Sequence, residues 1–184
     1  VGGGLVVIFT MIGGDPSILT GLATTGTGEV NITISGTTAI TLVNSSVFFG
    51  TGALNTDGTG TPINTTTCGN GANPDAFAEP CPITVRNDGN VDVNITFNGT
   101  PAANWLVAGS TYEFAGATGE GGCLAANLTT TRKPVAVALT QVCANLTWAD
   151  AADAFNINIF LNLTTLGPRS YNDTAVFIRA DRHL

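Results

Sequence analysis

The chain begins with Val1-Gly2-Gly3-Gly4-Leu5-Val6-Val7-Ile8-Phe9-Thr10-Met11-Ile12-Gly13-Gly14, an apolar segment that glycines close at both ends. Its core, residues 5–12, is far shorter than the ~20 apolar residues that a membrane-spanning helix needs. Most of these residues are β-branched, which favours a strand over a helix. Alternate side chains of a strand point to opposite faces, and here both faces are apolar. We therefore expect a strand that is buried on both faces, by this chain or by another.

Three interpretations of this strand remain open. An apolar terminal strand is a template for pairing with another chain, so it could be a donor strand that inserts into a neighbouring subunit. It could instead be the first strand of its own domain, or the end of a membrane anchor. The Thr/Gly-rich link at residues 18–28 is long enough to let the strand reach a neighbouring subunit, which favours the donor-strand interpretation. The side chains expected to make the contact are Leu5, Val6, Val7, Ile8, Phe9, Met11 and Ile12.

Composition restricts the partners of this chain. The 184 residues suffice for one domain with a substantial core. Charged residues make up 10% of the sequence, and the net charge is −7, whereas typical soluble domains have roughly 25% charged residues. A nucleic-acid partner is not expected, because the sequence has no basic patch. Mean hydropathy is +0.29 without a transmembrane run, so something other than charge must keep the surface hydrated.

N-linked sugar is our explanation for that hydration. The acceptor pattern N-x-[ST] occurs nine times, whereas chance predicts roughly three matches for this composition. An Asn- and Thr-rich β protein could produce some of these matches by composition alone, and that alternative stays open. The nine acceptors are Asn31, Asn44, Asn64, Asn94, Asn98, Asn127, Asn145, Asn162 and Asn172.

The acceptor pattern also follows the expected strands. In five of the nine matches the middle residue is a large aliphatic: Ile32, Ile95, Leu128, Leu146 and Leu163. Strand periodicity would turn that residue inward and place the Asn and the Thr on the solvent face. The core register therefore predicts that the acceptors point outward.

Four cysteines form an even set without a C-x-x-C spacing: Cys68, Cys81, Cys123 and Cys143. Disulfides in an oxidising compartment are favoured over zinc. Three connectivities are possible, and we favour Cys68–Cys81 and Cys123–Cys143 because the intervening loops are short. Each loop closure would stabilise the fold by ~3 kcal/mol. The last two cysteines share strand parity with Asn127 and Asn145, which predicts that their sulfur atoms lie on the outer face of a sheet.

Apolar and polar residues alternate in short runs from Glu29 to the C-terminal end. Asp88-Gly89 is a strong turn signal and predicts a hairpin over residues 82–97. Besides the two strands of this hairpin, we expect strands at 30–35, 39–42, 47–49, 105–114, 124–130, 135–148, 155–164 and 174–180, and one helical turn at 149–154. The fold class is all-β, an antiparallel, jelly-roll-like β-sandwich with an N-terminal donor strand. Residues 1–14 would be the donor strand, 15–28 the link and 29–184 a single domain.

No catalytic constellation is evident in the sequence. The single histidine, His183, lies next to the C-terminal end and is interpreted as part of a frayed tail. Without a second histidine no base–nucleophile pair is apparent, so we expect no enzyme. The carboxylates lack EF-hand spacing, and we expect no cofactor, although a structural Ca²⁺ ion stays open. The glycine runs lack the lysine and the following helix of a phosphate-binding loop.

Three local patterns resemble a group of extracellular filament subunits. They are the apolar N-terminal segment followed by a link and Val30-Asn31-Ile32-Thr33-Ile34, the run Val47-Phe48-Phe49-Gly50 entering a long loop, and the segment from Ile83 to Asn94. The chain resembles β-sandwich proteins of the TasA/camelysin type and the related archaeal bundling pili and thread filaments. That resemblance implies that the N-terminal strand of one subunit completes the sheet of its neighbour.

We therefore expect a structural subunit of an extracellular, glycosylated, pilus-like cell-surface filament. Its partners would be identical subunits joined head to tail, with no membrane span in the mature chain. The absence of an initial Met is interpreted as removal of a leader peptide, although a shortened sequence would look the same. The alternative is a monomeric or membrane-tethered carbohydrate-binding or adhesin module. Trp105, Trp148, Tyr112 and Tyr171 could form its sugar platform, but the strand pattern around both tryptophans favours core packing.

Overall fold

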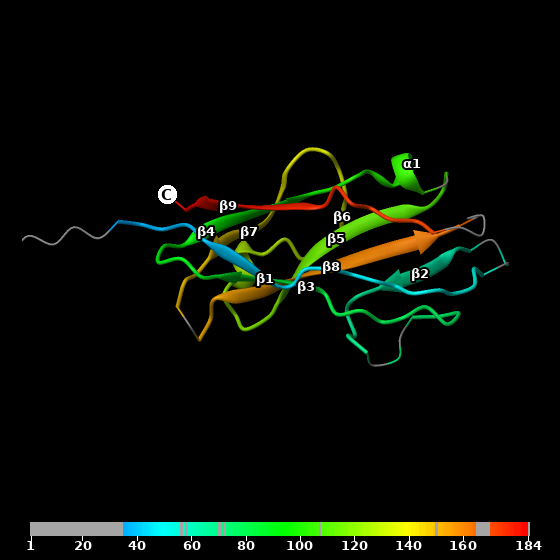
Figure 1. Ribbon diagram of the computed structural model, residues 1–184, viewed down its shortest axis with the longest axis horizontal. Coiled ribbons are helices and arrows are strands. Elements are labelled where there is room, and N and C mark those ends of the chain that lie inside the picture. The colour runs from blue at the N-terminus through cyan, green and yellow to red at the C-terminus, as the bar shows by residue number, and fades with distance from the viewer. Residues whose placement is uncertain are drawn as a thin grey trace, which may run out of the picture. The chain divides into compact units, whose positions relative to one another are not determined.

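The computed structural model describes residues 35–183, except 56, 58, 70, 72, 107, 150 and 165–169 (Figure 1). The expected donor strand at 5–12, the link at 15–28, the first alternating strand and the acceptor Asn31 all lie outside the described residues. From Gly36 onward the chain forms one compact unit.

The described chain is nearly all β and contains two antiparallel sheets. The larger sheet has the order β1 (Ile40–Asn44), β3 (Ile83–Asn87), β8 (Ala154–Leu163), β5 (Thr111–Thr118) and β6 (Lys133–Pro134), and β2 (Thr61–Asn64) pairs with β8 beside β3. The smaller sheet has the order β7 (Thr140–Leu146), β4 (Val93–Asn98) and β9 (Phe177–Arg182). Helix in the described part of the chain is limited to the four residues of α1 (Ala102–Trp105) and the 3₁₀ turn η1 (Ala125–Asn127).

One apolar core lies between the two sheets. In β4 and β8 buried residues alternate with half-exposed ones, as expected for strands with one face on a core. Phe97 from β4 and Phe114 from β5 are both fully buried, and their ring centroids are 4.7 Å apart. This contact joins the inner faces of the two sheets, and such aromatic pairs stabilise beyond the area they bury.

The predicted hairpin over residues 82–97 is wrong. β3 and β4 belong to different sheets, and the connection between them crosses from one sheet to the other (Figure 1). A tight type I′ hairpin needs positive φ at its central residues, and Gly89 does not have a positive φ. Instead the side chain of Asn87 donates to the carbonyl of Val91 (2.9 Å) and accepts from the amide of Gly89 (3.0 Å). A buried side chain, not a backbone turn, therefore shapes this connection.

Several expected elements also differ. Residues 47–49 form no strand, and the described residues of 149–154 form no helix, Ala154 being the first residue of β8. α1 and the strand β2 were not expected. Pro62 disfavours a strand at this position, because proline cannot donate to a sheet ladder. β2 pairs only with β8 among the described strands, and this position at a sheet edge tolerates the proline. Pro101 immediately before α1 was the available helix-start signal.

The long loop between β2 and β3 is held by side chains as well as by a disulfide. Cys68 is bonded to Cys81. The Glu79 carboxylate accepts from the backbone amides of Gly71 and Asn73. The side-chain amide of Asn73 in turn donates to two backbone carbonyls and accepts from the amide of Asn64. A loop of this length needs such internal bonds to remain compact.

Candidate assembly edges and glycosylation sites

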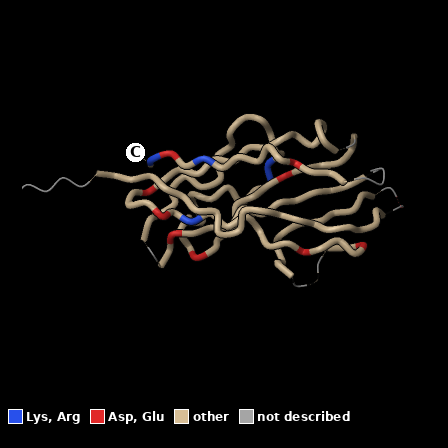
Figure 2. Tube along the Cα trace, in the orientation of Figure 1, with Lys and Arg blue, Asp and Glu red and all other residues tan. Residues whose placement is uncertain are grey.

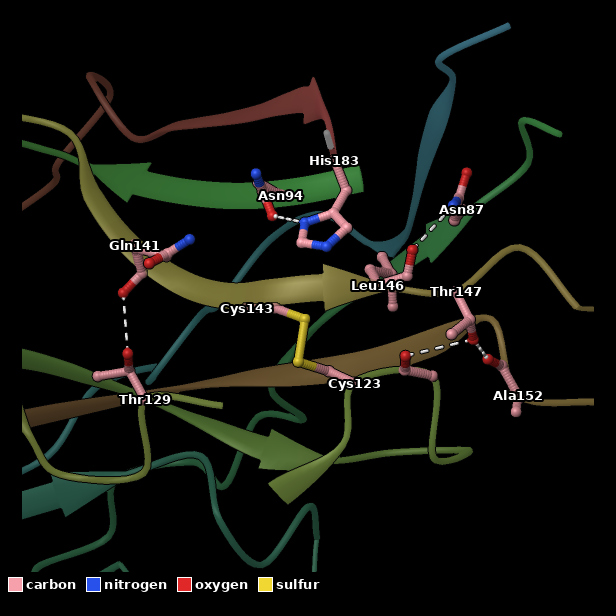
Figure 3. The surroundings of a disulfide bond; sticks show 11 residues. Asn87, Asn94, Cys123, Thr129, Gln141, Cys143, Leu146, Thr147, Ala152 and His183 are labelled. Carbon is pink, nitrogen blue, oxygen red and sulfur yellow. Dashed lines mark hydrogen bonds between the residues drawn. A yellow bond between two sulfur atoms is a disulfide. The ribbon is translucent and has the colours of Figure 1, made fainter. Parts of the chain in front are cut away.

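The structure pairs Cys68 with Cys81 and Cys123 with Cys143. The expectation that Cys123 and Cys143 lie on an outer face is wrong, because both are fully buried in the core (Figure 3). Two structural disulfides indicate an oxidising compartment.

A bulge in β7 explains why the parity argument failed. Val93 pairs with Leu146 and Ile95 pairs with Cys143, so two steps on β4 match three steps on β7. An extra residue of this kind switches the face on which the following side chains lie. Cys143 therefore shares the inward face of Ile95. On the other strand, Asn127 lies in the 3₁₀ turn, where strand parity does not apply.

The inward placement of the middle sequon residues is confirmed wherever the structure describes them. Ile95, Leu128, Leu146 and Leu163 are all buried. Their acceptors Asn94, Asn127, Asn145 and Asn162 are all half-exposed. Asn94 and Asn145 thus lie on the outer face of the smaller sheet and Asn162 on that of the larger sheet, while Asn127 lies in the 3₁₀ turn. Asn172 is exposed in the segment before β9.

The acceptor amides differ in their hydrogen bonds. Asn44 Nδ2 donates to the carbonyls of Cys81 and Pro82, and Asn98 Nδ2 donates to that of Val137. For Asn64, Asn94, Asn127, Asn145, Asn162 and Asn172, Nδ2 has no hydrogen bond to the described residues. An N-glycan is attached at Nδ2, so these six amides are freer to carry one than Asn44 and Asn98.

His183 is not part of a frayed tail. Its backbone amide donates to the carbonyl of Asp92, and its Nδ1 lies 2.9 Å from Oδ1 of Asn94 (Figure 3). The pairing of β9 with β4 thus continues one residue past the strand.

The four large polar aromatics do not form a common platform. Trp105 is half-buried and packs edge-on against buried Tyr112, with centroids 5.3 Å apart, and Tyr171 also packs against the core. The core role expected for Trp148 is wrong, because its side chain is 51% exposed. β7 ends at Leu146, so strand parity does not extend to this tryptophan.

The smaller sheet has an open edge at β9. β9 pairs with β4 on one side, and no described strand lies along its other side. Ile178 and Ala180 lie opposite Phe97 and Ile95, so they share the core-facing side of the sheet. Phe97 and Ile95 are fully buried, whereas Ile178 and Ala180 are only half-buried.

Among the described strands β1 pairs only with β3, so the larger sheet has a matching open edge at β1. Leu42 lies opposite Val85 and therefore points to the same, core-facing side. Val85 is fully buried, but Leu42 is 37% exposed. The smaller sheet therefore does not reach far enough to cover β1.

The two open edges lie on the same side of the fold. A methyl group on Gly36, just before β1, would come within 3.3 Å of the guanidinium carbon of Arg182 in β9. On the opposite side, a methyl group on Gly116 in β5 would come within 3.2 Å of Val142 in β7. β7 thus covers β5, whereas the core-facing side chains of β9 and β1 are only partly covered. We call this half-covered strip, formed by Ile40, Leu42, Ile178 and Ala180, the open groove.

Charged residues are scattered over the described chain (Figure 2). One open hollow of about 530 Å³ on the outside of the larger sheet contains Arg86, Asp88, Glu120 and Asp153. Nε of Arg86 donates a hydrogen bond to Oδ1 of Asp88, and the two atoms are 2.6 Å apart. That hydrogen bond lowers the pKa of the Asp88 carboxyl and raises the pKa of Arg86. Such an exposed pair contributes little to stability.

The described residues contain no group of three or more His, Cys, Asp or Glu side chains placed to hold a metal ion. None of the helices in the described part of the chain is long and apolar enough to cross a membrane.

No protein family, characterised protein or solved structure matches this chain.

Proposed function

We propose that this chain is the subunit of an extracellular, glycosylated, pilus-like filament in which residues 1–14 of one subunit occupy the open groove of the next. The observation that carries the proposal is the half-covered core between β9 and β1 in a chain that also contains an unusually apolar segment. In the complete subunit the two sheets and the donated strand would make a jelly-roll-like β-sandwich.

The groove and the segment match in chemistry. On the core-facing sides of the two edge strands, Ile40, Ile178 and Ala180 are half-buried and Leu42 is exposed. Residues 5–12 have apolar side chains on both strand faces, so one face can meet the core and the other can meet further protein. β9 offers an unpaired edge to which a strand can add by backbone hydrogen bonds.

The dimensions also match. Eight residues of strand extend roughly 27 Å, and the six residues of β9 extend about 20 Å. Burying seven large apolar side chains would contribute about 10–20 kcal/mol before the costs of association and ordering. When each subunit donates one strand and receives another, the contact is head to tail, and a head-to-tail contact that does not close into a ring produces a filament.

Deletion of residues 1–14 tests this proposal. We expect the truncated, secreted subunit to form no filaments by negative-stain electron microscopy and to expose its groove. Adding a synthetic peptide of residues 1–14 should then yield a soluble monomer with the peptide bound. Normal filaments from the truncated protein would overturn the donor role. A stable full-length monomer would assign the segment to its own domain.

A substitution in the groove gives an independent test. Leu42→Glu places a charge in the half-covered core once the donor strand is seated, so assembly should fail. Val137→Glu is the matched control, because Val137 is 70% exposed and lies in the loop before β7. The control should assemble like the unaltered chain. Equal assembly of both variants would show that the groove at β1 is not used.

Trp148 favours a second candidate function, a carbohydrate-binding module. Its indole is 51% exposed and could stack on a sugar ring. Trp105, Tyr112 and Tyr171 are packed against the core and cannot widen this surface into a platform. Glycan-array binding that is lost in Trp148→Ala, from a chain that stays monomeric, would favour this function over the filament.

A further inference from the structure

One of the nine acceptors has a feature that the others lack. Phe160 lies two residues before Asn162, and no other acceptor has an aromatic residue at that position. Both residues belong to β8 and are half-exposed on the outer face of the larger sheet. Alternate residues of a strand lie about 7 Å apart on the same face, so the ring lies beside the acceptor amide.

A small hollow surrounds these two residues. Its volume is about 210 Å³, below the ~300–1,000 Å³ of typical small-molecule sites. Phe160 lies between Asn64 on β2 and Glu113 on β5, and Asn162 lies between Pro62 and Thr111. The hollow is thus formed by three adjacent strands of one sheet, with Arg132 from the loop after η1 at its rim.

The hollow combines one aromatic ring with charged groups. The guanidinium carbon of Arg132 lies over one face of the Phe160 ring, 3.9 Å from its centroid, and holds the ring in place, so a sugar would stack on the other face. Neither Arg132 nor Glu113 has a side-chain hydrogen bond or ion pair with the described residues. Pyranose rings present C–H bonds that favour the electron-rich face of an aromatic ring, and hydroxyls that bond to charged donors and acceptors.

The backbone beside the acceptor is a glycine, which makes room for the Asn162 side chain. The carboxamide of Asn162 rests on Gly60, which has φ +83°, a conformation that favours glycine. Any side chain at position 60 would collide with Oδ1 of Asn162. Oδ1 of Asn162 is buried without a hydrogen-bond partner among the described residues. Nδ2 has no hydrogen bond to the described residues either, so no such bond has to break before a sugar is attached.

We propose that this hollow is the seat for the first sugar of a glycan on Asn162, which stacks on Phe160 and bonds to Arg132 and Glu113. The inference rests on the glycosylation in the proposed function and adds a bound position for one sugar. A glycan held in this way lies along the sheet and covers Phe160, instead of extending freely into solvent.

The test uses the glycoprotein purified from its natural host with residues 1–14 deleted and the peptide of residues 1–14 bound. Glycopeptide mass spectrometry first measures occupancy at Asn162. NMR should then show protons of its first sugar shifted upfield by the Phe160 ring current, and Phe160→Leu should abolish that shift. In a double-mutant cycle, Phe160→Leu should lower Tm by about 2–4 °C more when Asn162 carries its glycan than in the Asn162→Gln background.

Asn94 provides the matched control, since Asp92 occupies the position two residues before it. Asp92→Asn and Asn94→Gln should have additive effects on Tm. An occupied Asn162 without a ring-current shift and with additive effects would overturn the seat while leaving the filament and its glycosylation intact. An unoccupied Asn162 beside other occupied acceptors would also overturn it. A shift on the sugar of Asn64 instead would show that the hollow serves the neighbouring acceptor and that our assignment is wrong.

Discussion

At the scale of single residues, Asn87 links three parts of the fold. Its side chain is 1% exposed. Nδ2 donates to the carbonyls of Val91 and Leu146, and Oδ1 accepts from the amide of Gly89. These bonds join the end of β3, the crossing connection and the end of β7, so one polar side chain ties the larger sheet to the smaller one (Figure 3).

Asn87→Ala should therefore be strongly destabilising. It leaves three backbone groups without their partner in a buried site, and we expect a loss of about 2–4 kcal/mol in the free energy of unfolding. The control is Asn156→Ala, which removes a half-exposed bond to the hydroxyl of Thr84 and should cost about 1 kcal/mol or less. Urea denaturation of both variants measures the difference. Equal losses would contradict the linking role.

Tyr112 and Asp173 make stability depend on pH in the alkaline range. Burial raises the pKa of Tyr112, and the nearby negative charge of Asp173 raises it further. Asp173 is held in place because it accepts from the amide and hydroxyl of Thr100 and from the amide of Ala175. The neutral phenol is therefore favoured in the folded state.

Stability should fall as pH rises above about 10, the ordinary pKa of tyrosine. Below that pH both states keep the phenol proton, so the contribution is fully present. Above it the unfolded chain releases the proton first, which lowers the free energy of unfolding by up to ~1.4 kcal/mol per pH unit. Tyr112→Phe should remove this part of the slope. Urea midpoints between pH 8 and 11 measure it, and an unchanged slope in the variant would refute the assignment.

At the scale of elements, sequence periodicity predicted strands better than it predicted their partners. The strand expected at 155–164 is β8 at Ala154–Leu163, and the inward residues of β4 are those that alternation indicates. Alternation is a local property, so it cannot tell that β3 and β4 lie in different sheets. The bulge in β7 likewise depends on pairing with β4, which is why the burial of Cys143 could not be deduced from parity. The open groove could not be predicted either, because its position depends on the order of the strands in the two sheets, and short-range sequence patterns do not contain that order.

The two disulfides should differ in accessibility and in effect. Cys68 and Cys81 are exposed, whereas Cys123 and Cys143 are fully buried. Mild reductant should open Cys68–Cys81 first in the folded protein, as followed by alkylation and mass spectrometry. Cys123→Ala with Cys143→Ala should cost ~3 kcal/mol from the lost loop closure and more from the cavity left in the core. The matching double variant at 68 and 81 should cost ~3 kcal/mol or less. Reduction of the buried bond first would contradict this order.

At the scale of the whole molecule, the question is what keeps the surface hydrated, because the chain has few charged residues and exposes large apolar side chains. Charged residues are 10% of the chain, and large apolar side chains such as Phe48 and Val137 are strongly exposed in the described part. Acceptors lie on the outer faces of both sheets, with Asn94 and Asn145 on the smaller and Asn162 on the larger. Sugars at these positions would hydrate the broad faces and leave the open groove uncovered for a neighbouring strand.

Removing the sugars should therefore reduce solubility without unfolding the domain. The sample is the protein from its natural host, truncated at residue 14 and capped with the peptide of residues 1–14, so that polymerisation does not interfere. After enzymatic or chemical removal of the glycans, we expect light scattering to rise at concentrations where the untreated protein stays monomeric. Circular dichroism should stay unchanged, because the core between the sheets contains no sugar. A mock-treated sample is the control. If the sugar-free protein remains equally soluble, or fewer than three acceptors prove occupied, glycans are not what keeps this surface hydrated, and the exposed side chains must be covered by protein contacts instead.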